Sequence, residues 1–307
     1  MLISKRIYSK IILYYNDKLN ADGWIMDCLN IEKYKYHKNL FGIKETPYIK
    51  LFEEFICSSN DFFIECSLKI NKNKVHPLRI NVYYWNKNDV KENFDKILRF
   101  FEKMGKLPDV SINSGFYDKI IDKDMNFNKV LGVAVGIDFR QDSALSRVKL
   151  WTGFKDYPEK EQQVLSLHGF NKDIKNILTL FDSDMFSFGF DFYFNGKSRI
   201  KIYPHIQESL KSMALRERLR AYFHESVYDL LDNSCRIHLS FDGADYKKII
   251  HFFPHPYSYT DFIRKLNFKQ LEKLHEQIYK KYNKYRIIAV AEDEIISGKI
   301  TNAGLYY

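Results

Sequence analysis

Residues 185–203 read MFSFGFDFYFNGKSRIKIY, and this stretch decides the fold. Phenylalanine occupies every second position of its first half, and isoleucines continue the alternation after Asn195-Gly196. Alternation with a period of two is typical of a β-strand, and Asn-Gly between two such runs is a strong signal for a tight hairpin. The stretch therefore predicts two antiparallel strands, at 186–194 and 200–203, that share one apolar face.

The same hairpin pattern recurs on both sides of this stretch. Polar turn residues separate pairs of runs in which apolar and polar residues alternate. The further predicted strand pairs are 63–70 with 78–84, 130–139 with 148–154, 235–241 with 247–253 across Asp242-Gly243, and 285–291 with the C-terminal Leu305-Tyr306.

Amphipathic helices are predicted between the hairpins. From a cap at Asn88 to a stop at Gly105, apolar residues recur at spacings of three and four, and similar stripes predict helices within 207–231 and 262–282. Five hairpins make about ten antiparallel strands, and closing such a sheet removes its exposed edges. We therefore predict an α+β fold: a closed barrel with a solvated lumen, surrounded by α-helices from αββα repeats.

No linker divides the chain, because Pro (7) and Gly (13) are sparse, so we predict one domain over residues 1–307. The apolar run 11–15 is shorter than a signal-peptide core, and no run approaches the roughly 18 apolar residues of a membrane span. The four cysteines show no C-x-x-C spacing, so we expect neither a disulfide nor a zinc site. We expect a cytoplasmic monomer that acts away from membranes.

One face of each predicted strand is apolar, and we expect helices to cover it. The other face mixes cations, a few carboxylates and large aromatic side chains, which do not suit a sealed core because buried unpaired charges are costly. Such a face suits a lumen that binds a ligand with one anionic end and one apolar part. An open sheet with helices on one side is the structural alternative.

A net charge of +9 implies an anionic partner, which is either nucleic acid, a membrane surface or a phosphorylated small molecule. Cations from separate strands share the inner face, and a ring of Arg and Lys binds a diphosphate and stabilises charge on a leaving group. The sequence contains neither a G-x-x-x-x-G-K-[ST] loop nor a D-D-x-x-D cluster. The candidate diphosphate-binding residues are Arg79, Lys149, Lys201 and Arg236, with Tyr203 as a neutral donor.

An allylic diphosphate that ionises leaves a carbocation, which aromatic faces stabilise by ~1–2 kcal/mol each when desolvated, while they exclude water. The inner-face candidates for this shield are Tyr83, Trp85, Trp151, Tyr193 and Tyr203. Glu65 lies at the centre of the first strand on the same face and is the candidate catalytic base, because burial raises the pKa of a carboxyl group. Asp191 is predicted to orient the acceptor or to act as a second base.

At these residues the chain resembles the cyanobactin peptide prenyltransferases, members of the ABBA prenyltransferase superfamily. Residues 1–45 match poorly. The resemblance rests on the following motifs: Gly189-Phe190-Asp191-Phe192-Tyr193-Phe194-Asn195-Gly196-Lys197-Ser198, Ile202-Tyr203, Gly136-Ile137-Asp138, Lys149, Lys155-Asp156-Tyr157-Pro158-Glu159-Lys160, Leu51-Phe52-Glu53-Glu54-Phe55, Glu65 and Leu305-Tyr306-Tyr307.

The resemblance implies a barrel that takes an allylic isoprenyl diphosphate as donor, used with Mg²⁺, and a macrocyclic or linear ribosomal peptide as acceptor. It places the catalytic acid on Glu65 and donor-binding cations on Arg79 and Lys149. It also implies that His238 and Ile288 line the isoprenyl pocket: relatives carry a bulky aromatic or a small residue at the first position, according to donor length, and a large aromatic at the second. A less crowded pocket end would admit a C10 or longer chain beside the dimethylallyl group. Lys201 stands where some relatives have an acid.

Other functions remain open at this point. The same barrel would also serve a small phenol or indole acceptor. A nucleic-acid-binding protein would place its cations on an outer patch, and its affinity would fall steeply with salt, whereas the cations here alternate inward, so we expect no nucleic-acid partner. A carrier of an apolar ligand would not need Glu65.

Overall fold

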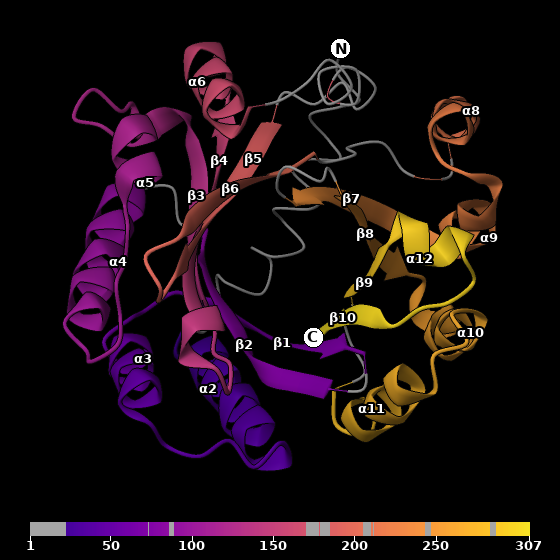
Figure 1. The fold of residues 1–307 in the computed structure, drawn as a ribbon, viewed down its shortest axis with the longest axis horizontal. Helices are drawn as coiled ribbons and strands as arrows, with labels where there is room; N and C mark the ends of the chain where they lie inside the picture. The colour runs from indigo at the N-terminus through magenta and orange to yellow at the C-terminus, as the bar shows by residue number, and fades with distance from the viewer. Residues whose placement is uncertain are drawn as a thin grey trace.

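The computed structural model describes residues 23–72, 74–85, 89–169, 178, 185–204, 210, 212–242, 247–282 and 287–307. In this part of the chain, ten strands pair into one closed antiparallel barrel in the order β1-β10-β9-β8-β7-β6-β5-β4-β3-β2 (Figure 1). The predicted closed barrel is therefore confirmed. The strands are β1 (Phe63–Asn71), β2 (Lys74–Tyr84), β3 (Val130–Asp138), β4 (Arg147–Lys155), β5 (Met185–Tyr193), β6 (Ser198–Tyr203), β7 (Ser234–Asp242), β8 (Lys247–Pro254), β9 (Ile287–Ala291) and β10 (Asn302–Tyr306).

Helices surround the barrel on its outside (Figure 1). Most of them follow a hairpin, as the αββα pattern requires, whereas α12 lies between the two strands of the last pair. Among the described residues, no helix has the length and apolar character needed to cross a membrane. The helices are α2 (Gly23–Leu40), α3 (Pro47–Cys57), α4 (Val90–Gly105), α5 (Gly115–Ile120), α6 (Pro158–His168), α8 (Met213–Tyr222), α9 (Tyr228–Asp232), α10 (Tyr259–Lys265), α11 (Lys269–Tyr279) and α12 (Glu292–Ile296).

The phenylalanine stripe of β5 explains how the helices attach. Phe190 and Phe192 are each 1% exposed, and their rings lie 5.9 Å from Tyr117 of α5 and 5.4 Å from Phe101 of α4. Because side chains alternate along a strand, this outer stripe leaves the intervening polar residues pointing into the barrel. The hydrophobic core is thus the layer between strands and helices, and the barrel interior is lined by the polar and aromatic face.

The hairpin predicted at Asn195-Gly196 is confirmed, since Gly196 has a φ of +80°, a conformation that favours glycine. The predicted helix 262–282 is wrong as one element: α10 and α11 are separated at Asn267, whose φ of +48° interrupts a helix. Likewise, extended backbone at Phe223, a buried side chain, separates α8 from α9 within 207–231. The predicted helix cap Asn88, helix start Gln207, turn residue Gly243 and strand start Tyr285 lie outside the described residues.

The C-terminal residue closes the barrel next to the centre of β1. Cys66 and Tyr307 exchange both backbone hydrogen bonds at 2.9 Å. The fully buried His37 of α2 holds this join through hydrogen bonds to the Tyr307 hydroxyl and to the Pro77 carbonyl. Burial lowers the pKa of His37 to about 4, so the ring is neutral at physiological pH. Glu65, one residue before Cys66, is therefore placed by a firmly joined segment.

Candidate active site

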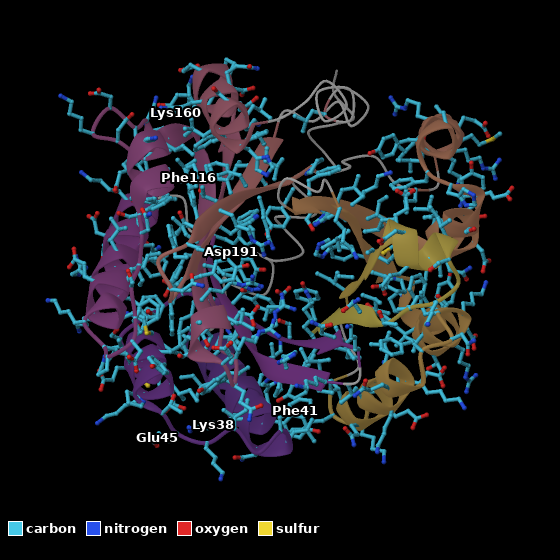
Figure 2. The ribbon with its side chains drawn as sticks, viewed as in Figure 1. Lys38, Phe41, Glu45, Phe116, Lys160 and Asp191 are labelled. Carbon is cyan, nitrogen blue, oxygen red and sulfur yellow. The ribbon has the colours of Figure 1, made fainter. Side chains whose placement is uncertain are left out.

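Strand register brings inward residues from distant parts of the sequence into neighbouring rows. One row runs from β1 to β5 and the next from β1 to β6. The first row contains Ser67, Arg79, Asp138, Arg147 and Tyr193, and the second Glu65, Asn81, Gly136, Lys149, Asp191 and Arg199. Figure 2 shows Asp191 within the ring of strands, whereas Lys38 and Lys160 lie among the helices outside it.

Asp138, at the end of β3, is the centre of the first group of charges. Its side chain has no exposed surface, and Arg147 Nη2 and Arg140 Nε each lie 2.6 Å from one of its oxygens. Arg79 Nε and Lys149 Nζ lie 3.3 and 3.8 Å from Oδ2. Burial alone would raise the pKa of Asp138, but these four cations hold it well below its usual range.

Asp191, in the neighbouring row on β5, is the centre of the second group. Lys201 Nζ, Arg199 Nη2 and Arg147 Nη1 lie 3.1, 2.9 and 3.3 Å from its Oδ2. Burial would raise the pKa of Asp191, but the surrounding cations hold it well below its usual value. The lowered pKa does not favour the predicted role of Asp191 as a second base, and its role in orienting the acceptor stays a prediction. Asp191 orders the cations around it.

Together these side chains form what we call the cationic cluster. In the part of the chain that the structure describes, it has seven cationic members against two carboxylates, a surplus that suits a multiply charged anion. The six members that stand on strands share the inner face, whereas a nucleic-acid-binding protein would carry its cations on an outer patch, and Arg140 joins them through Asp138 at the end of β3. The members are Lys69, Arg79, Arg140, Arg147, Lys149, Arg199 and Lys201.

Burial and the crowding of positive charges lower the pKa values of two lysines in the cluster. Burial and the nearby Arg79 and Lys201 lower the pKa of Lys69 to about 8. Burial, with Arg79 adding to it, lowers the pKa of Lys149 well below its usual range, although Asp138 opposes this. An anion bound at the cluster would favour the charged forms of both lysines.

Two tyrosines border the cluster. Tyr193, predicted as part of the carbocation shield, accepts a hydrogen bond from Arg147 Nη1, and the guanidinium of Arg199 lies 5.4 Å from its ring centre. The structure therefore places Tyr193 with the charges and not with the other aromatic side chains. Tyr306 of β10 accepts a hydrogen bond from Arg79 Nη2 at 3.3 Å.

Beyond the cluster, three aromatic side chains form one wall, which we call the aromatic wall. Tyr83 stacks on Trp85 with ring centres 5.6 Å apart, and Trp151 meets both rings edge-on at 6.2 and 5.6 Å. Small residues make room for the large rings: a Cβ at Gly189 would lie 3.3 Å from Tyr203 and 3.7 Å from Trp151. Tyr203 thus extends this wall, and the predicted shield residues Tyr83, Trp85, Trp151 and Tyr203 come together.

Glu65 lies between the cluster and the aromatic wall. Its Oε1 accepts hydrogen bonds from Asn81 Nδ2 at 2.8 Å and from the Tyr83 hydroxyl at 3.0 Å. Burial raises the pKa of Glu65 more than these hydrogen bonds, Lys33 and Arg79 lower it. A carboxyl group whose pKa is raised in this way accepts a proton more readily than an ordinary surface carboxylate does.

The inward residues of β2 show the order of the whole site. Arg79, Asn81 and Tyr83 follow one another on the inner face of β2, about 7 Å apart along the strand, and Trp85 continues their phase one residue beyond its end. A charge-binding end, a proton-accepting centre and an aromatic end therefore lie in sequence along one strand.

Two predicted residues lie elsewhere. Ile288 is wrong as a pocket residue: it is fully buried in the outer layer, opposite Leu305 and Phe252, and Phe252 packs on α10. The reason is strand phase, since Tyr306 points inward opposite Ile287 and the next residue must point outward. Arg236, predicted to bind diphosphate, lies over the Phe253 ring at 5.5 Å, with two strands between it and β4.

His238 does point inward, directly opposite His251, with its ring 4.7 Å from that of Phe253. His251 was not predicted, yet it lies between Tyr203 and Tyr306 and shares a hydrogen bond of 2.9 Å with Ser240. Burial, with Lys201 and Arg79, lowers the pKa of His251 to about 3, so this ring is neutral.

Sequence reasoning missed several members of the site. Asp138 stands on a predicted strand, and Arg147 and Arg199 directly precede predicted strands in the phase of Lys149 and Lys201, so alternation alone could have found them. Arg140 follows β3 and lies in no strand, and Asn81 carries no charge, so neither gave a signal. Their roles depend on the register between strands, which a single sequence does not contain.

The described residues do not fit a resident metal ion. Among them, no group of three or more His, Cys, Asp or Glu side chains could hold one. The two inward aspartates are already occupied by Arg and Lys.

Residues 30–307 match the model of a protein family described as a family of unknown function (DUF5838). No curated protein matches the chain. Among solved structures, the 6-dimethylallyltryptophan synthase of Micromonospora olivasterospora in complex with DMASPP and Trp is similar, with a TM-score of 0.52 and 11% identity, covering 79% of this chain and 80% of that one. The NotF prenyltransferase is similar with a TM-score of 0.50 and 13% identity, covering 80% of each chain. At these identities the likeness shows a shared fold, the barrel of the ABBA type.

Proposed function

We propose that this chain, which belongs to the family of unknown function (DUF5838), is a prenyltransferase that moves an isoprenyl group from its diphosphate to a nucleophilic side chain of a ribosomally made, macrocyclic peptide. One observation carries the proposal: a cationic cluster, a buried carboxyl group of raised pKa and an aromatic wall lie in that order inside one closed barrel. Each of the three parts matches one requirement of the reaction.

The cationic cluster is the proposed binding site of the diphosphate. Arg79, Arg147, Lys149 and Lys201 present guanidinium and ammonium groups from different strands, and charge-assisted hydrogen bonds to phosphate oxygens are strong in a partly dehydrated site. When the bond between C1 of the donor and the diphosphate oxygen breaks, the electron pair leaves on the diphosphate. The cluster stabilises that developing charge.

The aromatic wall is the proposed shield of the allylic cation. Tyr83 and Trp151 present ring faces and edges that stabilise a cation by ~1–2 kcal/mol each when desolvated and keep water away, and Trp85, which is 40% exposed, stacks on the Tyr83 ring. The acceptor nucleophile then forms its bond to the allylic carbon, and its proton passes to Glu65.

The proposal that the acceptor is a peptide rests on the resemblance to the cyanobactin peptide prenyltransferases. A small aromatic acceptor is the second candidate, because the similar 6-dimethylallyltryptophan synthase was solved in complex with Trp. For the donor, a dimethylallyl or a geranyl group fits the proposal, and a longer chain depends on the space beside His238, since Ile288 does not line the interior.

Mg²⁺, which the resemblance implies, would reach this site bound to the diphosphate, because Asp138 and Asp191 already bind Arg and Lys. There it would offset part of the diphosphate charge. No step of the proposed reaction passes through a metal bound by the protein.

The direct test is mass spectrometry of a panel of cyclic and linear peptides, free tryptophan and free tyrosine, each incubated with C5, C10 and C15 isoprenyl diphosphates. We expect a peptide to gain the mass of one prenyl group. If only the free amino acids gain a prenyl group, the acceptor is a small aromatic molecule and not a peptide. If no acceptor gains one, the proposed function is wrong.

Glu65→Gln is the companion variant. We expect the rate of transfer to fall about a hundredfold or more, because Gln cannot accept the proton, while the affinity for the donor stays close to that of the wild type. A protein that only carries an apolar ligand would bind it equally well after this change. A transfer rate equal to that of the wild type would show that Glu65 is not the base.

A further inference from the structure

The two oxygens of the Glu65 carboxyl group have different surroundings. Both hydrogen bonds to this group, from Asn81 and from Tyr83, end on Oε1. Among the described residues, none donates a hydrogen bond to Oε2. The donors come from one face of β2, so they fix the rotation of the carboxyl group and leave Oε2 as the oxygen that can take a proton.

Asn81 reaches Glu65 only because residue 136 has no side chain. Asn81 lies directly opposite Gly136 in the β2–β3 pair. A Cβ built at Gly136 would be in hard contact with Asn81 Oδ1, and 3.3 Å from the backbone oxygen of Ile80. The backbone oxygen cannot move away easily, so the Asn81 side chain would have to swing from its present place.

We propose that Asn81 is a positioning residue for the proposed reaction: its amide holds Oε1 of Glu65 so that Oε2 receives the proton of the acceptor, and Gly136 provides the space in which Asn81 does so. This inference rests on the proposed prenyl transfer. It assigns a role to a residue with no charge and to a glycine in the middle of a strand, where glycine is otherwise unfavourable.

The electrostatic surroundings of Glu65 agree with this role. The charged and titratable groups that interact with it electrostatically are Lys33 from α2, Arg79 and Tyr83 from β2, and the neighbouring Cys66, which points to the outer face of β1. After burial, which raises the pKa of Glu65, the hydrogen bond from Asn81 is the largest opposing influence and lowers it. Loss of the Asn81 amide should therefore let Glu65 keep its proton to higher pH.

The first experiment measures the protonation of Glu65 without any substrate. The infrared band of the protonated carboxyl group is followed against pH, and the spectrum of Glu65→Gln is subtracted to isolate Glu65. We expect the midpoint to move to higher pH in Asn81→Ala and in Gly136→Ala. Gly153→Ala is the matched control, because its added methyl group would meet Ser187 and Leu131 and not Asn81, so its midpoint should equal that of the wild type.

The double variant Asn81→Ala/Gly136→Ala tests whether Gly136 acts through Asn81. Alanine at 81 has no Oδ1 for the new methyl group to displace, so we expect the double variant to match Asn81→Ala alone. Additive shifts would overturn the coupling. Thermal unfolding is recorded for every variant, and if Gly136→Ala does not fold, Asn81→Ala alone decides the inference.

The second experiment measures transfer at saturating donor. We expect Asn81→Ala to lower the turnover rate about tenfold, to move the acidic limb of the pH profile to higher pH and to leave the KM for the donor unchanged. If the wild type transfers no prenyl group, the proposed function fails whatever the infrared result. If the wild type is active and Asn81→Ala keeps both its midpoint and its rate, the inference about Asn81 is wrong.

Discussion

Arg147 and Asp138 lie directly opposite each other in the β3–β4 pair, and Nη2 of the arginine is 2.6 Å from Oδ2 of the aspartate. The same guanidinium reaches Asp191 with Nη1 at 3.3 Å. One arginine thus links the two buried carboxylates around which the cationic cluster is built. The carboxylates keep the cations in place before a ligand arrives, which reduces the rearrangement needed when a diphosphate binds.

Replacement of Asp138 should destabilise the free protein and increase the stabilisation that a bound anion provides. We expect Asp138→Asn to lose about 3 kcal/mol of unfolding free energy, because it leaves buried cations without their partner. Added pyrophosphate should then raise the melting temperature more than it does in the wild type. Asp122→Asn, which breaks an ion pair with Lys160 outside the barrel, is the matched control. Equal responses to pyrophosphate in all three proteins would argue against the cluster as the binding site.

Lys149 should act on the donor and not on the fold. We expect Lys149→Met to raise the KM for the isoprenyl diphosphate about tenfold or more, since a hydrogen bond between charged groups is lost. Lys96→Met, a lysine of α4 that pairs with Glu92 on the protein surface, should leave the KM unchanged. The measurement is steady-state transfer at fixed acceptor, and a KM for Lys149→Met equal to that of Lys96→Met would contradict the assignment.

Donor binding should take up protons near pH 8. The pKa of Lys69 is lowered to about 8 by burial and by neighbouring cations, and that of Lys149 is lowered as well. An incoming diphosphate favours the charged lysines and raises these pKa values, so affinity should weaken as pH rises through about 8. Calorimetry with a thiolodiphosphate analogue in two buffers of different ionisation enthalpy measures the uptake. Identical binding enthalpies in both buffers would refute this prediction.

Removal of metal ions should slow the reaction without abolishing it. The cationic cluster already supplies the charge that stabilises the diphosphate, and its aspartates are occupied by Arg and Lys. We expect transfer to continue, at a reduced rate, in the presence of excess EDTA. The check is a single-turnover rate with EDTA and with added Mg²⁺, and complete loss of transfer in EDTA would show that the cations alone do not suffice.

The barrel could be predicted from the sequence because its pattern is local. Alternation and Asn195-Gly196 mark strands and turns within a few residues, and closure follows from their number. Helix ends were less predictable. The break at Asn267 comes from its positive φ, and no proline marks it in the sequence.

Residues of the site were predictable where their position depends only on alternation along one strand. They were not predictable where it depends on the pairing register between strands. Glu65, Arg79 and Lys149 could be assigned to the interior from alternation alone. The partnership of Asp191 with three cations, the contact of Asn81 with Glu65 and the outward position of Ile288 depend on which residue lies opposite which. Register between strands that lie far apart in the sequence is a property of the folded barrel.

The central claim is that the cationic cluster inside the barrel binds the diphosphate of an isoprenyl donor. A crystal structure with geranyl thiolodiphosphate measures this most directly. We predict density for the diphosphate within hydrogen-bonding distance of Arg79, Arg147, Lys149 and Lys201, with the isoprenyl chain along Tyr83 and Trp151. A diphosphate bound on the outer surface, with the cluster left as it is in the free protein, would contradict the account.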